Sequence, residues 1–417
     1  MTESQIEQHA LDILASLGWQ VLHGPNIGPD GAAVERELRQ VVLPGRLYNA
    51  LVRLNPHIPE PALNEAMRRL TQISKPSVIE NNHDFHQLLV AGVPVQYRAP
   101  SGETKHDIVR VVDFTSPKNN DFAAVNQLTV LQGDYNRRPD IVLFVNGLPL
   151  VVIELKNAAD TKADLVAAYQ QIQTYKREIS DLFRFNELCV TSDGLEAEMG
   201  TITSPLERMM PWKTIDGEKE VGNVPMLEVL LCGACTPERL LDIVQNFIVF
   251  ERSDGDKLIK KVAAYHQYWV VNKALDRTLT ASSERGDQRA GVVWHTQGSG
   301  KSLSMVFYTG KLMKSRNLHN PTIVVVTDRN DLDGQLFGTF SACRELLGED
   351  PKQSNSRSEL RKLLQRQAGG IIFTTIQKFS PEDEEDSLPV LTDRRNVIVM
   401  ADEAHRSQYG LKAHVRA

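Results

Sequence analysis

Three charged residues that could together perform metal-dependent phosphodiester chemistry lie within the segment 137–156, RRPDIVLFVNGLPLVVIELK. Asp140 comes just before one apolar run, and Glu154 and Lys156 come at the end of the next. Two carboxylates can hold Mg²⁺, and a lysine can steady an attacking water or a developing negative charge. The pattern predicts a phosphodiester-hydrolysing site, and an ion pair at the edge of a sheet is the alternative that it leaves open.

A β-hairpin is the element that must position these residues. Apolar runs at 141–145 and 148–155 flank Asn146-Gly147, a typical two-residue hairpin turn. Because side chains alternate along a strand, Glu154 and Lys156 share one face, and Asp140 can meet them across the hairpin. An acid and a base at the end of a buried strand cost free energy unless they pair or bind a metal, which favours a functional site.

The patterns around the hairpin indicate a compact α/β domain. An amphipathic helix is expected over 4–17, and because Ser4 and Glu7 have capping-box spacing, Glu7 is interpreted as a cap rather than a metal ligand. Further elements are expected at 62–73 (helix), 96–98, 107–114 and 125–131 (strands) and 162–179 (helix). Gln171 and Tyr175 share a face of the last helix, either as an accessory to the site or as a packed tyrosine with a polar neighbour.

The second half of the chain contains a glycine-rich loop that could bind phosphates. After the loop-like stretch 191–224, helices are expected from Thr236, a cap followed by proline, to about 250, and over 257–279. A short strand at 291–294, the loop HTQGSGKS and a helix at 303–313 then follow. This order predicts a P-loop, although His295 stands where a small residue is usual. The residues expected to bind ATP with its Mg²⁺ are Gly298, Ser299, Gly300, Lys301 and Ser302, the last as a Mg²⁺ ligand.

Three apolar segments after this loop predict the strands of a parallel sheet, at 322–326, 370–375 and 396–400. The last of them leads directly into Asp402 and Glu403. Asp402 is expected to hold Mg²⁺, and Glu403 is expected to activate the attacking water. Acids favoured by the dipole at a helix N-terminus are the alternative.

Bulk properties agree with an ordinary globular protein. The 417 residues carry a net charge of −6, which argues against a passive DNA-coating protein but not against a local basic groove. Four cysteines in a chain of this length indicate a reducing compartment. Without a signal peptide or an 18-residue apolar run, we expect a cytoplasmic protein with no membrane partner.

The order of the motifs is more specific than any one of them. RPD…ExK, Q-x-x-x-Y, HTQGSGKS, TDRNDLDGQ, TTIQKF and ADEAHRSQ together resemble the R (restriction and motor) subunit of type I restriction endonucleases over essentially the whole chain. The resemblance implies a PD-(D/E)xK-type nuclease domain with Asp140, Glu154 and Lys156 as its catalytic set. It also implies that Gln171 and Tyr175 form the accessory nuclease motif.

The same resemblance implies a partial RecA-like, parallel-sheet P-loop ATPase lobe of helicase superfamily 2, with its Asp-Glu-x-His box at 402–405. Gln267 in AYHQYWVV resembles the adenine-recognising glutamine of this family. The expected domains are a nuclease at 1–200, a connecting segment at 201–255 and an incomplete first motor lobe at 256–417. Mg²⁺ and ATP are the implied cofactors. Double-stranded DNA and the methyltransferase and specificity subunits are the implied partners.

The family continues into a second motor lobe, whereas this sequence ends twelve residues after His405. We therefore expect an N-terminal portion, such as a truncated gene product, that binds nucleotide and hydrolyses it poorly. Two rival hypotheses remain open at this stage. One is a stand-alone Mg²⁺ nuclease with a vestigial nucleotide-binding lobe, and the other is a non-catalytic assembly piece that docks to the methyltransferase.

Overall fold

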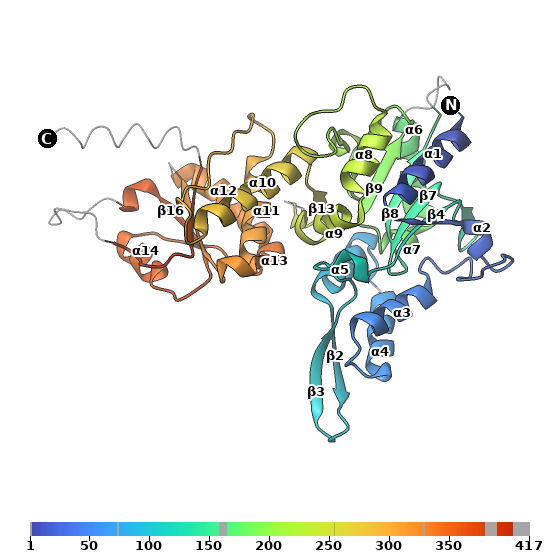
Figure 1. Cartoon of the computed structure of the whole chain (residues 1–417), viewed down its shortest axis with the longest axis horizontal. Coiled ribbons are helices and arrows are strands. Elements are labelled where there is room, and N and C mark those ends of the chain that lie inside the picture. Colours follow the sequence, from blue (N-terminus) through green and yellow to red (C-terminus); the bar gives the residue numbers. More distant parts are fainter. Residues whose placement is uncertain are drawn as a thin grey trace. The chain divides into compact units, whose positions relative to one another are not determined.

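A computed structural model describes residues 2–72, 75–157, 165–253, 255–327, 330–379 and 390–402 of the chain. The chain divides into two compact units, Met1–Tyr265 and His266–Ala417 (Figure 1). Each unit combines helices with a sheet, so the chain belongs to the mixed α/β class that the sequence predicts.

The first unit is organised around a mixed sheet. In its described residues the strands follow the order β1-β4-β7-β8-β9-β10-β11. The strands are β1 (Gln20–His23), β4 (Phe122–Asn126), β7 (Ile141–Val145), β8 (Leu148–Leu155), β9 (Leu188–Ser192), β10 (Ala197–Gly200) and β11 (Met210–Pro211). The pairs β1 with β4 and β8 with β9 are parallel, and the other neighbouring pairs are antiparallel.

The central hairpin β7–β8 matches the sequence prediction. Asn146 and Gly147 have φ angles of 50° and 78°, and they join Val145 to Leu148 as a two-residue turn. Every residue of both strands is buried, which agrees with their β-branched, apolar composition. The Asn146 side chain donates to the carbonyl of Val111 and so ties the turn to the surrounding chain. The hairpin is therefore a rigid base for residues at its open end.

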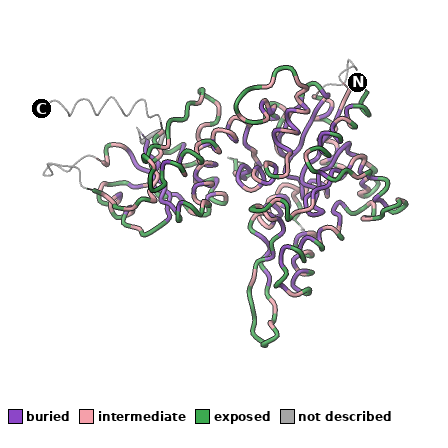
Figure 2. The backbone as a smooth tube through the Cα atoms, viewed as in Figure 1, coloured by how far each residue is buried: buried purple, intermediate pink, exposed green. Residues whose placement is uncertain are grey.

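Helices pack against this sheet (Figure 1), and every residue of its central strands β7, β8 and β9 is buried (Figure 2). Helix α1 (Glu3–Ser16) packs against β1, β4 and β8, and α6 (Leu165–Glu178) packs against β8 and β9. The unit also contains α3 (Pro44–Leu54), α4 (Glu60–Thr71), α5 (Val78–Ala91), α8 (Met226–Ala234), α9 (Pro237–Asn246) and the exposed hairpin of β2 (Val93–Arg98) and β3 (Thr104–Val109). The helices expected at 4–17, 62–73 and 162–179 are thus confirmed wherever the chain is described.

The start of helix α1 differs from the prediction. Its cap is Thr2, whose hydroxyl accepts from the Gln5 amide while the Gln5 side chain accepts from the Thr2 amide. Because this capping box lies two residues before the expected one, Glu7 falls in the second turn of the helix. The interpretation of Glu7 as a cap is therefore wrong.

Local strand and helix boundaries differ at other places too. The strand expected at 107–114 ends at Val109, because β3 spans Thr104–Val109. The strand expected at 125–131 breaks at Gln127, whose φ of 52° ends β4 and separates it from β5 (Val130–Gln132). In the predicted helix 236–250, the carboxyl end is a strand in the structure. In the predicted helix 257–279, the amino end is a strand. These strands, β12 (Ile248–Arg252) and β13 (Leu258–Val262), pair with each other in an antiparallel hairpin. Antiparallel pairing across the short connection between these two strands overrides helical periodicity here.

The second unit contains a parallel sheet with the order β15-β16-β14-β17 in its described residues. Its strands are β15 (Lys352–Gln353), β14 (Thr322–Thr327), β16 (Ile371–Thr375) and β17 (Val397–Ala401), and its helices include α10 (Tyr265–Ser282), α11 (Lys301–Lys314), α12 (Asn330–Ala342) and α14 (Arg357–Leu364). The strands predicted at 322–326, 370–375 and 396–400 are confirmed.

The strand predicted at 291–294 is absent from the described structure, where this segment has no regular form. Val292 and Trp294 are 91% and 89% exposed. An apolar run becomes a strand only when a neighbouring strand satisfies its backbone groups. No described strand pairs with this segment, which explains why the prediction is wrong here.

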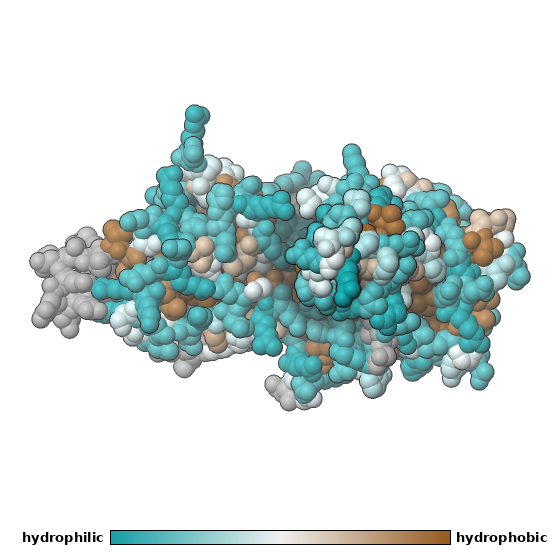
Figure 3. Space-filling view, turned by 90° about the horizontal axis from the view of Figure 1, so that it is seen from below, coloured by the Kyte–Doolittle hydropathy of each residue, from teal (hydrophilic) through white to brown (hydrophobic). Residues whose placement is uncertain are grey.

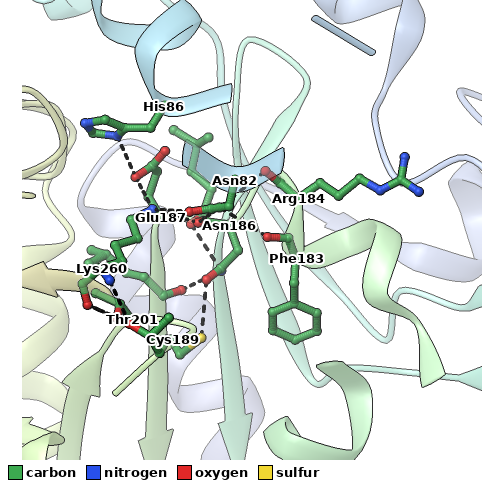
Figure 4. Close-up of polar contacts among 12 residues, drawn as sticks. Asn82, His86, Phe183, Arg184, Asn186, Glu187, Cys189, Thr201 and Lys260 are labelled. Carbon is green, nitrogen blue, oxygen red and sulfur yellow. Dashed lines mark hydrogen bonds and ion pairs between the residues drawn. The ribbon is translucent and has the colours of Figure 1, made fainter. Parts of the chain in front are cut away.

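A buried ionic cluster joins several elements of the first unit (Figure 4). The ammonium of Lys260 on β13 contacts Glu187 Oε2 at 2.5 Å and Asn82 Oδ1 at 3.0 Å, and His86 Nδ1 lies 3.0 Å from the same Glu187 oxygen. Burial raises the pKa of Glu187, but Lys260 and His86 outweigh it and lower that pKa below its ordinary value. Because the Glu187 amide donates to the carbonyl of Leu150, the cluster also fixes strand β8.

The face drawn in Figure 3 is mostly hydrophilic, with small scattered hydrophobic patches. Among the helices that the structure describes, none has both the length and the apolar character needed to span a bilayer.

Candidate active site

The hairpin brings Asp140, Glu154 and Lys156 together, as the sequence predicts. Asp140 precedes β7, and its Oδ2 accepts a hydrogen bond of 2.7 Å from the amide of Leu155. The Lys156 ammonium lies 2.7 Å from Glu154 Oε1 and 2.8 Å from the carbonyl oxygen of Leu155. The three side chains therefore meet at the open end of the hairpin, where the two strands leave their ladder.

Burial makes the two carboxyl groups unusual acids. Asp140 is 7% exposed and Glu154 is 2% exposed. Burial raises the pKa of Asp140 to about 6. Burial, followed by the negative charge of Asp140, raises the pKa of Glu154 to about 8. Each charged carboxylate is thus disfavoured until a cation compensates it.

One oxygen of this pair accepts no hydrogen bond within bonding distance from the described residues, although the nearby Tyr175 hydroxyl acts to lower the pKa of Glu154. Glu154 Oε1 is bonded to Lys156, whereas Glu154 Oε2 is buried without a hydrogen-bond partner in the described residues. A buried carboxylate oxygen without a partner costs free energy that a bound cation would recover. The donor set of two carboxylates fits Mg²⁺, which binds few protein oxygens and keeps several waters. Among the described residues, no group of three or more His, Cys, Asp or Glu side chains is placed to hold a metal ion.

Lys156 and the accessory residues complete the surroundings of Glu154. Burial alone would lower the pKa of Lys156, but the adjacent Glu154 raises it above the ordinary value. Tyr175 is buried on α6, and its hydroxyl lies 3.4 Å from the Arg138 carbonyl oxygen. Burial and then Glu154 raise the pKa of Tyr175, whereas Gln171 lowers it. Gln171 and Tyr175 therefore belong to the same neighbourhood as the acids.

Sequence reasoning missed a second layer around Asp140. The amide of Gln127, at the bend after β4, donates to the main-chain carbonyl of Asp140 over 2.9 Å. Glu7 on α1 accepts hydrogen bonds from the side chains of Asn126 and Gln127. No signal in the sequence marks Gln127, because glutamine rarely adopts a positive φ.

The glycine-rich loop precedes helix α11 as predicted. Gly298 and Gly300 both have φ of 82°, a conformation that favours glycine. Gly300 is the N-cap of α11, which begins at Lys301, and Ser302 follows within the first turn. The N-terminus of this helix offers backbone N–H groups and a partial positive charge, which together suit phosphate.

Two side chains from helix α10 hold the glycine-rich loop. Gln267 donates to the carbonyl oxygen of Gly300 over 3.0 Å, and His266 Nε2 lies 3.1 Å from the carbonyl oxygen of Ser299. His295 Nδ1 lies 3.0 Å from the hydroxyl of Ser299. Burial, His266 and Lys301 all lower the pKa of His295, in that order. Gln267 thus contacts the loop itself, and its recognition of adenine stays a prediction.

Asp402 lies at the carboxyl end of β17, where its amide donates to the carbonyl of Val326 at the end of β14. This edge of a parallel sheet is where such folds bind ligands. Glu403 lies outside the described residues, so its expected role has no structural counterpart here.

Comparison with known proteins gives two adjoining matches. Residues 1–208 match the family described as type I restriction enzyme R protein N terminus, and residues 266–417 match the SWI2/SNF2 ATPase family. The type I restriction enzyme HindI endonuclease subunit of Haemophilus influenzae is 47% identical, over 98% of this chain and 39% of its own length. The putative type I restriction enzyme MjaIXP endonuclease subunit of Methanocaldococcus jannaschii is 33% identical over 98% of this chain and 40% of its own. The chain therefore spans about two fifths of the length of these curated relatives.

Proposed function

This chain belongs to the family of type I restriction enzyme R proteins, whose N-terminal region it matches, and from that premise we propose that it carries a Mg²⁺-dependent DNA nuclease site and an ATP-binding site. The nuclease site is Asp140, Glu154 and Lys156, in a domain of the PD-(D/E)xK class. The ATP site is the glycine-rich loop, in a lobe of the RecA-like class.

The single observation that carries the nuclease proposal is the state of Glu154. Its Oε2 is buried and without a hydrogen-bond partner in the described residues, beside a second buried carboxyl group and a lysine. An ion pair kept only for stability would satisfy both oxygens, because a half-satisfied buried carboxylate is destabilising. A cation at Glu154 Oε2 and Asp140 accounts for this arrangement.

Each residue then has a distinct task in hydrolysis of a phosphodiester. Asp140 and Glu154 would hold Mg²⁺, which supplies Lewis acidity toward a phosphate oxygen and lowers the pKa of a bound water. Lys156 keeps its proton because Glu154 raises its pKa, so it stabilises negative charge rather than acting as a base. The Leu155 amide fixes one Asp140 oxygen by hydrogen bonding, which leaves the other oxygen of that side chain for the metal. Tyr175 and Gln171 position Glu154 from α6.

The second unit would bind ATP at the start of α11. Gly298, Ser299 and Gly300 would present backbone N–H groups to the phosphates, and Lys301 would contact their outer oxygens. Ser302 and Asp402 would hold the nucleotide's Mg²⁺, Glu403 would orient the attacking water, and Gln267 would contact the adenine base. In the whole complex, we propose that such a motor moves double-stranded DNA together with methyltransferase and specificity subunits.

Relaxation of supercoiled plasmid by the 417-residue chain tests the nuclease proposal. We expect nicking in Mg²⁺, abolished by EDTA and reduced at least 100-fold in Glu154→Ala, because removing a metal ligand removes the reaction's main electrostatic support. Glu65→Ala, which changes an exposed carboxylate on α4, is the matched control and should nick normally. Equal nicking by wild type and Glu154→Ala would refute the assignment.

A further inference from the structure

We propose that Glu7 is a positioning residue for the nuclease site, which holds the bend at Asn126–Gln127 in the conformation that fixes Asp140. This inference rests on the nuclease function proposed above. It concerns a residue of helix α1 that lies far from Asp140 in the sequence and that the sequence pattern assigned to helix capping.

The contacts form a continuous path from α1 to the catalytic acid. Glu7 Oε1 accepts a hydrogen bond of 2.6 Å from the Asn126 side chain, and Glu7 Oε2 accepts one from the Gln127 side chain. The Gln127 amide then donates to the Asp140 carbonyl over 2.9 Å. Since Asp140 Oδ2 accepts from Leu155, the path ends on the strand that carries Glu154.

The bend that Glu7 holds is strained. Gln127 has φ of 52°, in the left-handed region of backbone conformation, which residues other than glycine, asparagine and aspartate seldom adopt. Such a conformation persists only when its surroundings impose it. In the described structure, the two carboxylate oxygens of Glu7 accept hydrogen bonds from the side-chain amides of Asn126 and Gln127, and these bonds hold the bend in place.

His23 and Gly24 of the same chain also contact this bend. His23 Nδ1 lies 3.0 Å from Asn126 Oδ1, which orients the Asn126 amide group toward Glu7. A Cβ atom at Gly24 would lie 2.5 Å from the Gln127 carbonyl oxygen, so the chain approaches the bend as closely as glycine permits. The position of the bend is therefore specified by close packing, and its backbone conformation by Glu7.

A positioning role for Glu7 differs from a role exerted only by charge or only as a metal ligand. Glu3 and Glu7 both raise the pKa of Asp140 through their charges, but only Glu7 has hydrogen bonds to the bend among the bonds of the described residues. If positioning is the role, the effect of losing Glu7 must depend on the residue at 127. A direct metal ligand would show no such dependence.

The experiment is a double-mutant cycle on the full chain, read by calorimetric binding of Mn²⁺ and by hydrogen–deuterium exchange without metal. We expect Glu7→Gln to weaken Mn²⁺ binding about tenfold or more and to accelerate exchange at the Gln127 and Leu155 amides, as for other residues that orient metal ligands. In a Gln127→Gly background, where positive φ costs nothing, Glu7→Gln should weaken binding less than threefold. Glu3→Gln is the charge-matched control and should change neither readout by more than twofold.

Each outcome bears on one of the two proposals. In one outcome, Glu7→Gln weakens Mn²⁺ binding equally in the wild-type and Gln127→Gly backgrounds and leaves hydrogen exchange at the Gln127 and Leu155 amides unchanged. That result would overturn the positioning role in favour of direct metal ligation by Glu7. Unchanged binding and exchange in Glu7→Gln would overturn it altogether. Absence of Mn²⁺ binding by the wild type would instead count against the nuclease proposal, and the exchange data would still decide whether Glu7 holds the bend.

Discussion

Replacing Glu154 by glutamine should make the metal-free protein more stable at alkaline pH while destroying its metal site. Burial and Asp140 raise the pKa of Glu154 from its ordinary 4.5 to about 8. At about 1.36 kcal/mol per pH unit, ionising this group in the folded chain costs about 5 kcal/mol. Asp140 and Lys156 titrate together with Glu154, so only part of this cost is removed when Glu154 alone is replaced. We therefore expect Glu154→Gln to stabilise the folded protein by about 2–5 kcal/mol at pH 9.

The pH window follows from the direction of the shift. A carboxyl group whose pKa is raised by folding contributes stability that is complete below the unfolded pKa and is lost as pH rises through the folded pKa. The wild type should therefore lose stability between about pH 4.5 and pH 8, and Glu154→Gln should lose less over the same range. The two proteins should approach equal stability as the pH falls well below 4.5, where Glu154 is protonated in both the folded and the unfolded wild type.

Hydrogen exchange of the β7 and β8 amides in EDTA measures the stability difference between wild type and Glu154→Gln. Because both strands belong to the first unit, it reports on that unit alone. Glu198→Gln is the matched control, because its carboxyl group is less buried and it lies on β10, two strands away from β8 in the sheet. In saturating Mg²⁺ at pH 8, the wild type should instead be more stable than Glu154→Gln, since only the wild type gains stability from bound metal. A Glu154→Gln protein that is less stable than wild type at pH 9 without metal would refute the reasoning.

Further predictions concern the other sites. Lys301→Ala should weaken binding of a fluorescent ATP analogue at least tenfold, and undiminished binding would contradict the assignment of the loop. Lys260→Met should destabilise the first unit by about 3–5 kcal/mol in urea titrations, because it leaves Glu187 charged and buried, and adding Glu187→Gln should recover most of that loss. Nicking at subsaturating Mg²⁺ should rise between pH 6 and pH 8, because Asp140 and Glu154, with pKa values of about 6 and 8, must both ionise to bind the metal. A flat profile would count against this pair as the ligands.

Local sequence patterns predicted the hairpin and its three charged residues because every relevant signal is short-range. Asn146-Gly147 specifies the turn, β-branched residues specify the flanking strands, and alternation sets which side chains share a face. The same holds for α11, whose start is fixed by Gly300 and whose first residues are Lys301 and Ser302. These elements need no distant contact to be recognised.

The features that sequence reasoning missed depend on strand pairing or on contacts between distant segments. Strands β12 and β13 were predicted as parts of helices, because their pairing with each other is invisible to helical periodicity. The bend at Gln127 is imposed by Glu7, which lies 120 residues earlier. The buried charge of Lys260 is compensated by Glu187, which directly precedes β9 and is 73 residues away in the sequence. A lysine on an exposed face would give the same sequence signal.

The central claim is that Asp140 and Glu154 hold a divalent cation, and X-ray diffraction at the manganese absorption edge tests it most directly. Crystals of the chain soaked in Mn²⁺ above pH 8, where both acids ionise, should give an anomalous peak in contact with Glu154 Oε2 and an Asp140 oxygen. The same crystals of Glu154→Gln should lose that peak. Well-ordered wild-type crystals with manganese bound elsewhere and none at this pair would contradict the account.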